Sequence, residues 1–375
     1  MILQSCTSSL VACNIYITSA ASAALPSLLS RAQDHCRQLR LVRQQCKDEN
    51  KESNTTAAAA VVHAYADIPY DRSSFHLAGR SDCVAEVAIS LIQNALNEIE
   101  LKSNNNNDAS NKLEARHPFV GLVDHVSVMS ITSQESGTTT STAAAAAATA
   151  ARQIGSQIDQ SNSNSIKIHY YGMACPNNTP LAAVRRKTSF FNSGGARDNN
   201  ENQQQQLYEK GECTIGAPLD FVENYNIRLT PNVDFGTAKT LTQVLRGRNI
   251  ATKGMGVPGV EALTLPYIRD AADLNGGNVY EVACNLLEPK IGSVEMIEVE
   301  LEKWIEQQKQ QLLSKDDGDD TNDQYDRDYF IEEAYRVGTT EEQCLSVLKN
   351  ADDDEYWMQY DQQVFSRFNE FLGYK

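Results

Sequence analysis

The sequence predicts an α+β protein with two α/β sandwich subdomains and an acidic C-terminal tail. Its 375 residues are enough for about two domains that each bury a core. Strand-like and helix-like stretches alternate in two blocks, which a stretch rich in Asn and Gln separates. The predicted boundaries are 8–197 for the first subdomain, 198–212 for the linker, 213–313 for the second subdomain and 314–375 for the tail.

The first block is predicted to run strand, helix, strand, strand, helix, strand, which is the order of a ferredoxin-like half. Its strands are rich in β-branched and aromatic residues, and its helices carry apolar residues at helical spacing. Pro26 suits the first turn of one helix, and Ser81 suits the N-cap of the other. A Thr/Ala-rich, helix-prone stretch and a further strand follow. The predicted strands are 10–18, 57–67, 73–78, 119–129 and 166–171.

The second block repeats an α/β pattern, so we expect a second ferredoxin-like sandwich. For the tail, aromatic residues suggest short docked helices, but a solvated extension is favoured because acidic runs usually stay in water. The predicted strands are 213–215, 221–229, 260–266 and 279–287, the helices 235–246 and 293–313, and the amphipathic pieces of the tail 330–336, 341–348 and 364–372.

Charge and cysteine content exclude several classes of protein. Residues 314–375 carry 17 acidic and 6 basic side chains, −11 of the net charge of −16, so a nucleic-acid partner is not expected. The nine cysteines lack metal-ligand spacing, which indicates reduced thiols and no metal site. No uncharged apolar run reaches about 18 residues, so no membrane span or membrane partner is predicted. Residues 1–5 lack the basic start of a signal peptide, so we expect a cytoplasmic protein, with organelle targeting left open.

The stretch around His117 is where the sequence indicates chemistry. Pro118 favours extended backbone angles at His117, which places the imidazole at the entrance of the predicted strand 119–129. This strand is apolar on both faces, which is typical of the interior of a covered sheet. A carboxylate such as Asp124 is costly to bury there without partners, so it suggests a site. Alternation places His125 on the opposite face, where we expect a structural role.

Seven short motifs occur in a fixed order along residues 8–312. They are Leu10–Cys13; Asp67, Pro69 and Asp71-Arg72-Ser73; Asp82–Glu86; His117, Pro118, Gly121 and Asp124; Tyr171-Gly172 with Leu181–Arg185; Tyr225–Leu229; and Val282–Leu287. Together they resemble the formiminotransferase domain family, as in glutamate formiminotransferase and formiminotransferase–cyclodeaminase. The motif typical of that family is His-Pro-x-x-Gly-x-x-Asp, which His117, Pro118, Gly121 and Asp124 match.

The resemblance implies two subdomains with a cleft between them and transfer of a formimino group from N-formiminoglutamate to N5 of tetrahydrofolate, a co-substrate. It identifies His117 as the general base and acid, a task that suits an imidazole with a pKa near neutrality. Asp67 or Asp124 is expected to orient it. The partners are then small molecules, with a homodimer as a further option.

Both substrates carry carboxylates, so guanidinium or ammonium groups are expected in the site. The residues predicted to contact substrate are Asp71, Arg72, Arg116, Arg185, Lys210 and Gly211. Arg186 and Lys187 extend Arg185 into a basic run, for which a solvated surface is the favoured alternative.

Two departures from the family pattern support a competing hypothesis. The family's basic residues around the His-Pro pair are replaced by Leu113–Arg116 and Phe119, and its folate loop corresponds to 202–211, where only Gly211 matches. The alternative is therefore an inactive formiminotransferase-like module that binds folate or a protein.

Overall fold

A computed structural model describes most of the chain and divides it into two compact units. The first unit comprises Met1–Asn104, Pro118–Leu219 and Thr339–Lys375, and the second comprises Asn105–His117 and Asp220–Gly338. The described residues are 9–50, 58–100, 117–132, 140–162, 165–188, 208–247, 256–268, 279–314, 325–350 and 353–374. Within these ranges, only the backbone is described for residues 43–50 and 140.

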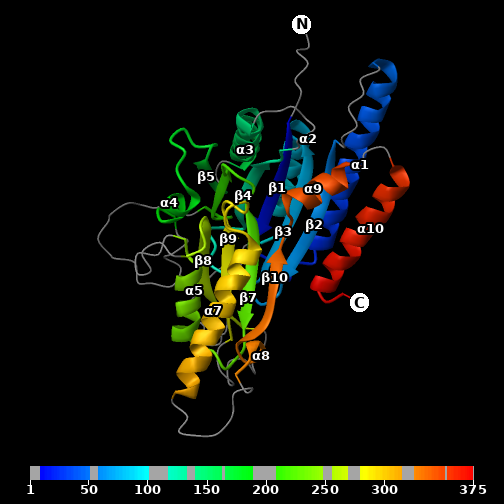
Figure 1. The fold of residues 1–375 in the computed structure, drawn as a ribbon. Helices are drawn as coiled ribbons and strands as arrows, with labels where there is room; N and C mark the ends of the chain where they lie inside the picture. Colours follow the sequence, from blue (N-terminus) through cyan, green and yellow to red (C-terminus); the bar gives the residue numbers. More distant parts are fainter. Residues whose placement is uncertain are drawn as a thin grey trace, which may run out of the picture. The chain divides into compact units, whose positions relative to one another are not determined.

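The first unit is built on a sheet with the strand order β2-β3-β1-β4-β6-β5 (Figure 1). Neighbours from β2 to β4 are antiparallel, whereas β6 runs parallel to β4 and to β5. The first four strands, with the helices between them, have the ferredoxin-like order that the sequence predicts. The strands are β1 (Leu10–Ile17), β2 (Ala59–Asp67), β3 (Arg72–Arg80), β4 (Val123–Ser130), β5 (Lys167–Gly172) and β6 (Glu212–Ala217).

Helices α1 (Leu25–Asn50), α2 (Ser81–Glu98) and α3 (Thr140–Asn162) pack on this sheet. The Ala-rich part of the Thr/Ala stretch is helical, as its composition predicts, and α3 belongs to the core, because Ala147, Ala151 and Ile154 are fully buried. Ile15 and Ile17 of β1 belong to the same core cluster, so Tyr16 between them points to the opposite face of the sheet.

The structure assigns 213–215 differently from the sequence prediction. These residues form part of β6 in the first sheet, between β4 and β5, rather than opening the second subdomain. Cys213, Thr214 and Ile215 are all buried there. A short apolar run fixes a strand but carries no information about which sheet it joins.

The second unit repeats the ferredoxin-like plan. Its antiparallel sheet has the order β10-β7-β9-β8, and helices α5 (Phe235–Leu245) and α7 (Val294–Leu313) share its core (Figure 1). The chain order β7-α5-β8-β9-α7-β10 therefore matches that of the first unit. The strands are β7 (Glu223–Leu229), β8 (Val260–Tyr267), β9 (Val279–Leu286) and β10 (Ile331–Val337).

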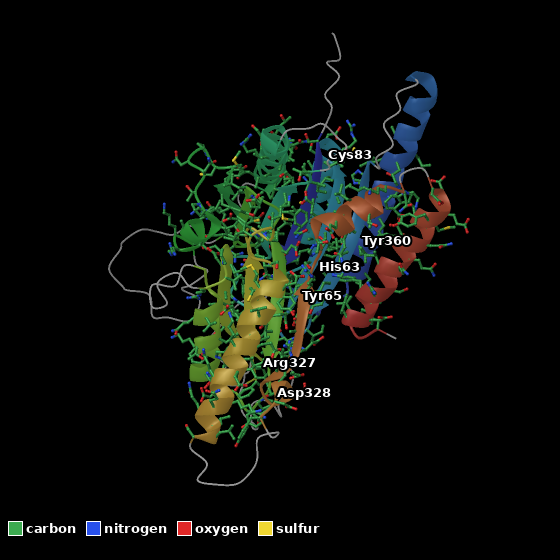
Figure 2. The ribbon with its side chains drawn as sticks, viewed as in Figure 1. His63, Tyr65, Cys83, Arg327, Asp328 and Tyr360 are labelled. Carbon is green, nitrogen blue, oxygen red and sulfur yellow. The ribbon has the colours of Figure 1, made fainter. Side chains whose placement is uncertain are left out.

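Strand β10 corrects the prediction of an acidic tail with short helices. It pairs with β7 and completes the second sheet, and helix α8 (Arg327–Phe330) just before it is joined to α7 by an Arg327–Glu298 ion pair of 2.8 Å (Figure 2). Ile331 is buried, and Glu333 pairs with Arg228 of β7 at 3.0 Å. The acidic composition does not predict this strand, because the partner of Glu333 is about a hundred residues away in the sequence.

The last two helices, α9 (Glu341–Leu348) and α10 (Asp354–Phe371), belong to the first unit. Both contact the edge strand β2, and α10 lies beside α1 (Figure 1). Tyr360 of α10 donates a hydrogen bond of 2.7 Å to the carbonyl of Val62 in β2, the strand that also carries His63 and Tyr65 (Figure 2). Covering an edge strand in this way blocks unwanted pairing with another chain.

Burial and charge pairing fix α10 on α1. Arg40 of α1 is 5% exposed, pairs with Asp361 at 3.4 Å and lies over the ring of Trp357, 4.2 Å from its centroid. Phe368 is fully buried in the core of the first unit. Aromatic residues in the tail did suggest docking, and the surface they dock on is this chain's own first sheet.

Candidate functional site

Asp124 is the centre of the candidate site. Its side chain is 1% exposed, and its Oδ1 accepts a hydrogen bond of 2.9 Å from the backbone N–H of Val120. Its Oδ2 accepts hydrogen bonds from Arg72 at 3.0 Å and from Arg185 at 3.2 Å. Arg72 begins β3, and Arg185 ends the short helix α4 (Leu181–Arg185). One buried carboxylate therefore holds two guanidiniums from separate elements.

A β-bulge explains why Asp124 lies where it does. Tyr16 of β1 pairs with His125 of β4, but Ile17 pairs with Val123, so Asp124 is the extra residue. A bulge interrupts the alternation of side chains and can re-aim one of them. As a result both residues lie near Tyr16: His125 stacks on its ring, and Asp124 binds Arg72, which covers that ring. Strict alternation predicts instead that Asp124 and His125 lie on opposite faces of the sheet.

Arg72 is held from two directions. Asp124 binds its guanidinium edge, and the ring of Tyr16 lies under its face, 4.6 Å from the guanidinium carbon to the ring centroid. Burial lowers the pKa of Arg72, and Asp124 opposes that effect. The group stays charged, because the pKa of a guanidinium starts far above neutrality.

Three rings form a stack beside the arginines, which we call the three-ring stack: Tyr16 of β1, His125 of β4 and Tyr171 of β5. Tyr16 and His125 stack with centroids 5.7 Å apart, and His125 and Tyr171 with centroids 5.3 Å apart. None of the seven sequence motifs includes Tyr16. A signal was present, because Asn14 and Tyr16 are polar residues on one face of an otherwise apolar strand.

The turn between β2 and β3 orders the residues that precede Arg72. Asp67 accepts hydrogen bonds from the backbone N–H of Tyr70 at 3.0 Å and from the hydroxyl of Tyr65 at 3.2 Å. Asp71 has a φ of +48°, a left-handed conformation that is unusual for a residue other than glycine, and its carboxylate accepts the N–H of Ala20 at 2.8 Å. Both aspartates thus organise the turn, and a catalytic role for Asp67 stays a prediction.

The other predicted site residues are less closely associated with Asp124. His117 is half-buried and is grouped with the second unit, so its approach to Asp124 stays a prediction. Arg116 lies outside the described residues. Lys210 donates a hydrogen bond of 3.0 Å to the carbonyl of Ile99, and Gly211, with φ +79°, forms an isolated bridge with Gly121. These contacts give Lys210 and Gly211 a structural role in this conformation.

The second unit carries a polar cluster of its own. Ile227 and Leu229 belong to its core, so Arg228 between them points to the other face of the sheet. Arg228 pairs with Glu281 at 3.5 Å, and Glu281 is fully buried. Arg228 donates hydrogen bonds to the hydroxyls of Tyr267 and Tyr335, and the hydroxyl of Tyr335 donates one to Glu281. The two rings lie 4.2 and 5.1 Å from the guanidinium carbon.

The described residues contain neither a metal-ligand cluster nor a membrane-spanning helix. No group of three or more His, Cys, Asp or Glu side chains in those residues is arranged to hold a metal ion. No helix within the described ranges is both long and apolar enough to cross a membrane.

Comparison with known proteins gives a family match. The model of the formiminotransferase domain, N-terminal subdomain, matches residues 37–240, a range that includes Arg72, His117, Asp124 and Arg185. A formiminotransferase cyclodeaminase-like protein of Arabidopsis thaliana is 24% identical over 250 residues, which are 62% of this chain and 73% of that protein.

Comparison with solved structures adds little. The periplasmic protease PqqL of Escherichia coli aligns with a TM-score of 0.17 at 11% identity, over 99% of this chain and 42% of that one. A putative M16-like peptidase of Alicyclobacillus acidocaldarius gives a TM-score of 0.20 at 12% identity, over 97% of this chain and 90% of that one. Scores this low do not indicate a shared fold.

Proposed function

Given that this chain belongs to the formiminotransferase domain family, we propose that it is a folate-dependent transferase of one-carbon groups. In this proposal it moves a formimino group from N-formiminoglutamate to N5 of tetrahydrofolate and releases glutamate. The 24% identity to the plant relative supports the class of reaction and leaves the donor to experiment.

The observation that carries the proposal is the arginine pair on Asp124. Both proposed substrates carry carboxylates, and arginine recognises a carboxylate through a planar fork of donors. Arg72 and Arg185 are 17% and 13% exposed in their side chains, and Asp124 fixes one nitrogen of each. Guanidiniums that are ordered before the substrate arrives bind it with less loss of conformational entropy.

His117 is the proposed base and acid. The N5 amine attacks the formimino carbon, its proton passes to the imidazole, the bond to the glutamate nitrogen breaks, and the proton returns to that nitrogen. An imidazole suits both transfers, because its ordinary pKa lies near 6.5. Asp124 accepts its side-chain hydrogen bonds from Val120, Arg72 and Arg185, so we assign it to positioning the arginines and leave the orienting role to Asp67.

A second candidate function is a formiminotransferase-like module that binds folate or a protein and has no turnover. The ammonium of Lys210, at the end of the segment that replaces the family's folate loop, is bound to the carbonyl of Ile99. This contact leaves it poorly placed for a folate carboxylate in the described conformation, which favours weakened folate recognition.

Calorimetric titration with tetrahydrofolate tests folate binding by the arginine pair, which is the first requirement of the proposed function. We expect wild type to bind, Arg72→Ala and Arg185→Ala to bind at least 10-fold more weakly, and His117→Ala to bind like wild type, because losing a hydrogen bond to a charged group costs about 1.5–3 kcal/mol. Arg186→Ala is the matched control, since Arg186 is exposed and adjacent to Arg185.

A formimino-transfer assay then tests turnover. Loss of transfer in His117→Ala, with folate affinity kept, supports the proposed base. Absence of transfer in a wild-type protein that does bind folate favours the module. Absence of folate binding by wild type at millimolar concentration overturns both folate-based candidates.

A further inference from the structure

The three-ring stack and Arg72 form one continuous column across the first sheet. The guanidinium of Arg72 covers Tyr16, Tyr16 stacks on His125 at an interplanar angle of 27°, and His125 stacks on Tyr171 at 28°. These four side chains come from β3, β1, β4 and β5. Stacks of this kind are worth more than the area they bury, and a guanidinium over an aromatic face adds electrostatic attraction.

Hydrogen bonds determine the tautomer of His125. The hydroxyl of Thr214 donates to the backbone carbonyl of Asp124 at 3.1 Å, which uses its single proton. Nδ1 of His125 lies 3.0 Å from the same hydroxyl oxygen, so it must carry a proton and donate. Nε2 lies 3.4 Å from the hydroxyl of Tyr171, from which it accepts when the ring is neutral. The network therefore specifies a proton on Nδ1, and the surrounding charges decide whether the ring is neutral.

The charges around His125 agree with the neutral form. Burial lowers the pKa of His125 well below its ordinary value, and Arg185 and Arg72 lower it further. A cationic imidazole would repel both arginines across the stack. A neutral ring instead supports Tyr16 from behind without competing with Arg72 for the carboxylate of Asp124.

We propose that Tyr16 and His125 are positioning residues for the carboxylate-binding arginines, a role that rests on the proposed function. Asp124 fixes the edge of the Arg72 guanidinium, and Tyr16, held by His125, fixes the orientation of its plane. Bidentate recognition of a substrate carboxylate depends on that plane, because the two N–H bonds must point at two oxygens at once. Neither residue is expected to touch the reacting atoms.

The test compares Tyr16→Phe, which keeps the ring, with Tyr16→Leu, which removes it. The first readout is the rate at which phenylglyoxal modifies Arg72, followed by peptide mass spectrometry. It needs no substrate. The second readout is the dissociation constant for tetrahydrofolate. We expect Tyr16→Leu to raise the modification rate and to weaken folate binding by on the order of 10-fold, while Tyr16→Phe stays near wild type in both.

A second pair of variants tests the support behind Tyr16. His125→Phe keeps a ring at this position, and His125→Leu does not. We expect Arg72 to be modified most slowly in wild type, faster in His125→Phe and fastest in His125→Leu. This pair also replaces the first if Tyr16→Leu fails to fold, as judged by circular dichroism.

Several outcomes would overturn the proposal. It falls if Arg72 modification is unchanged in Tyr16→Leu and His125→Leu, or if Tyr16→Phe is as damaged as Tyr16→Leu, since the hydroxyl would then be the determinant. If wild type does not bind tetrahydrofolate, the proposed function fails, and the modification rate alone decides whether the stack orders Arg72. The two failures are therefore distinguishable.

Discussion

The first unit places one buried carboxylate against two guanidiniums, whereas the second places one guanidinium against two carboxylates. Asp124 holds Arg72 and Arg185, and Arg228 is held by Glu281 and Glu333. Both sets lie on the sheet face that points away from the core of the same ferredoxin-like plan. Among the directly paired groups, the first cluster has a charge of about +1 and the second about −1 at neutral pH.

This difference indicates how one fold acquires two roles. A positive cluster with ordered arginines suits an anionic substrate, so the first unit is the candidate for recognition. In the second unit the arginine is enclosed by glutamates and tyrosines, which suits a structural ion pair. The strand order is the same, and the sign of the charge at the centre distinguishes the units.

The largest expected effect separates the units by truncation. A chain that ends after Ser314 loses α8, β10, α9 and α10, and a chain that ends after Gly338 loses only α9 and α10. Both keep Trp304, which is 1% exposed in the core of the second unit and becomes the sole tryptophan, because the other, Trp357, lies in α10. We expect a cooperative Trp304 fluorescence transition in urea for the longer chain and its loss in the shorter one.

The reason is the loss of α8 together with the fourth strand. Without β10, β7 is an exposed edge, and without Phe330 of α8 the core around Trp304 is open. A sharp transition of Trp304 in the chain that ends after Ser314 would show that the second unit does not need β10.

The next effect tests the two centres with matched isosteric changes, Asp124→Asn and Glu281→Gln. Removing one partner of a buried ion pair typically costs about 3–5 kcal/mol, so both variants should lose free energy of unfolding on that order. Tetrahydrofolate affinity, measured by calorimetry on the folded fraction, should fall only for Asp124→Asn. Equal loss of affinity in both variants would remove the functional distinction between the units.

A smaller effect is the pH dependence of stability, which belongs to the first unit. Burial lowers the pKa of His76 well below its ordinary value, as it does for His125, and lowers the pKa of His63 to about 4. Each histidine protonates more readily in the unfolded chain, so its stabilising contribution is complete above pH 6.5 and is lost as the pH falls toward the folded pKa.

His76→Gln isolates one of these contributions. Between pH 6.5 and pH 5 the wild type should lose about 1.6 kcal/mol more than this variant. The slope is below the full 1.36 kcal/mol per pH unit near pH 6.5, because the unfolded histidine is only half-protonated there. Urea unfolding at the two pH values measures it. The pH dependence that Asp361 contributes has the opposite sign, because burial raises its pKa. Asp361 is present in both proteins, so its contribution cancels in the comparison. An identical slope in both proteins would contradict the assignment.

The smallest effect tests whether α10 belongs to the first unit. Tyr360→Phe removes the hydrogen bond to the carbonyl of Val62 and should cost about 1 kcal/mol, while Tyr356→Phe, in the same helix, is the control. Trp357 should report the change by fluorescence, and Trp304 in a Trp357→Phe background should not. If only the unfolding transition of Trp304 shifted, α10 would belong to the second unit and the assignment would be wrong.

Local patterns were sufficient to predict most elements. The core strands, helix α2 and the Ala-rich helix follow from apolar spacing that each segment carries alone. Which strands pair depends on residues distant in sequence. For this reason the sequence predicts the wrong sheet for β6 and a tail in place of β10. The charges of β10 resemble a solvated run until Arg228, about a hundred residues earlier, is placed beside Glu333.

The candidate site was predictable in part for the same reason. The motifs singled out Arg72, Asp124 and Arg185, and the structure joins them directly. Tyr16 and Thr214 could not be connected to them from sequence, because their role depends on a bulge at Asp124 and on the parallel pairing of β4 with β6. His117 remains the residue whose assignment depends on the family pattern.

The placement of α10 also has a consequence for biosynthesis. Its docking strand, β2, leaves the ribosome about 290 residues earlier, which at roughly 5–20 residues per second is about 15–60 s. During that interval the whole second unit emerges while the outer edge of β2 has no cover from α10. A nascent chain with an open strand edge is prone to intermolecular pairing. Folding yield in the cell should therefore depend on translation speed downstream of β2 and on chaperones that bind nascent chains.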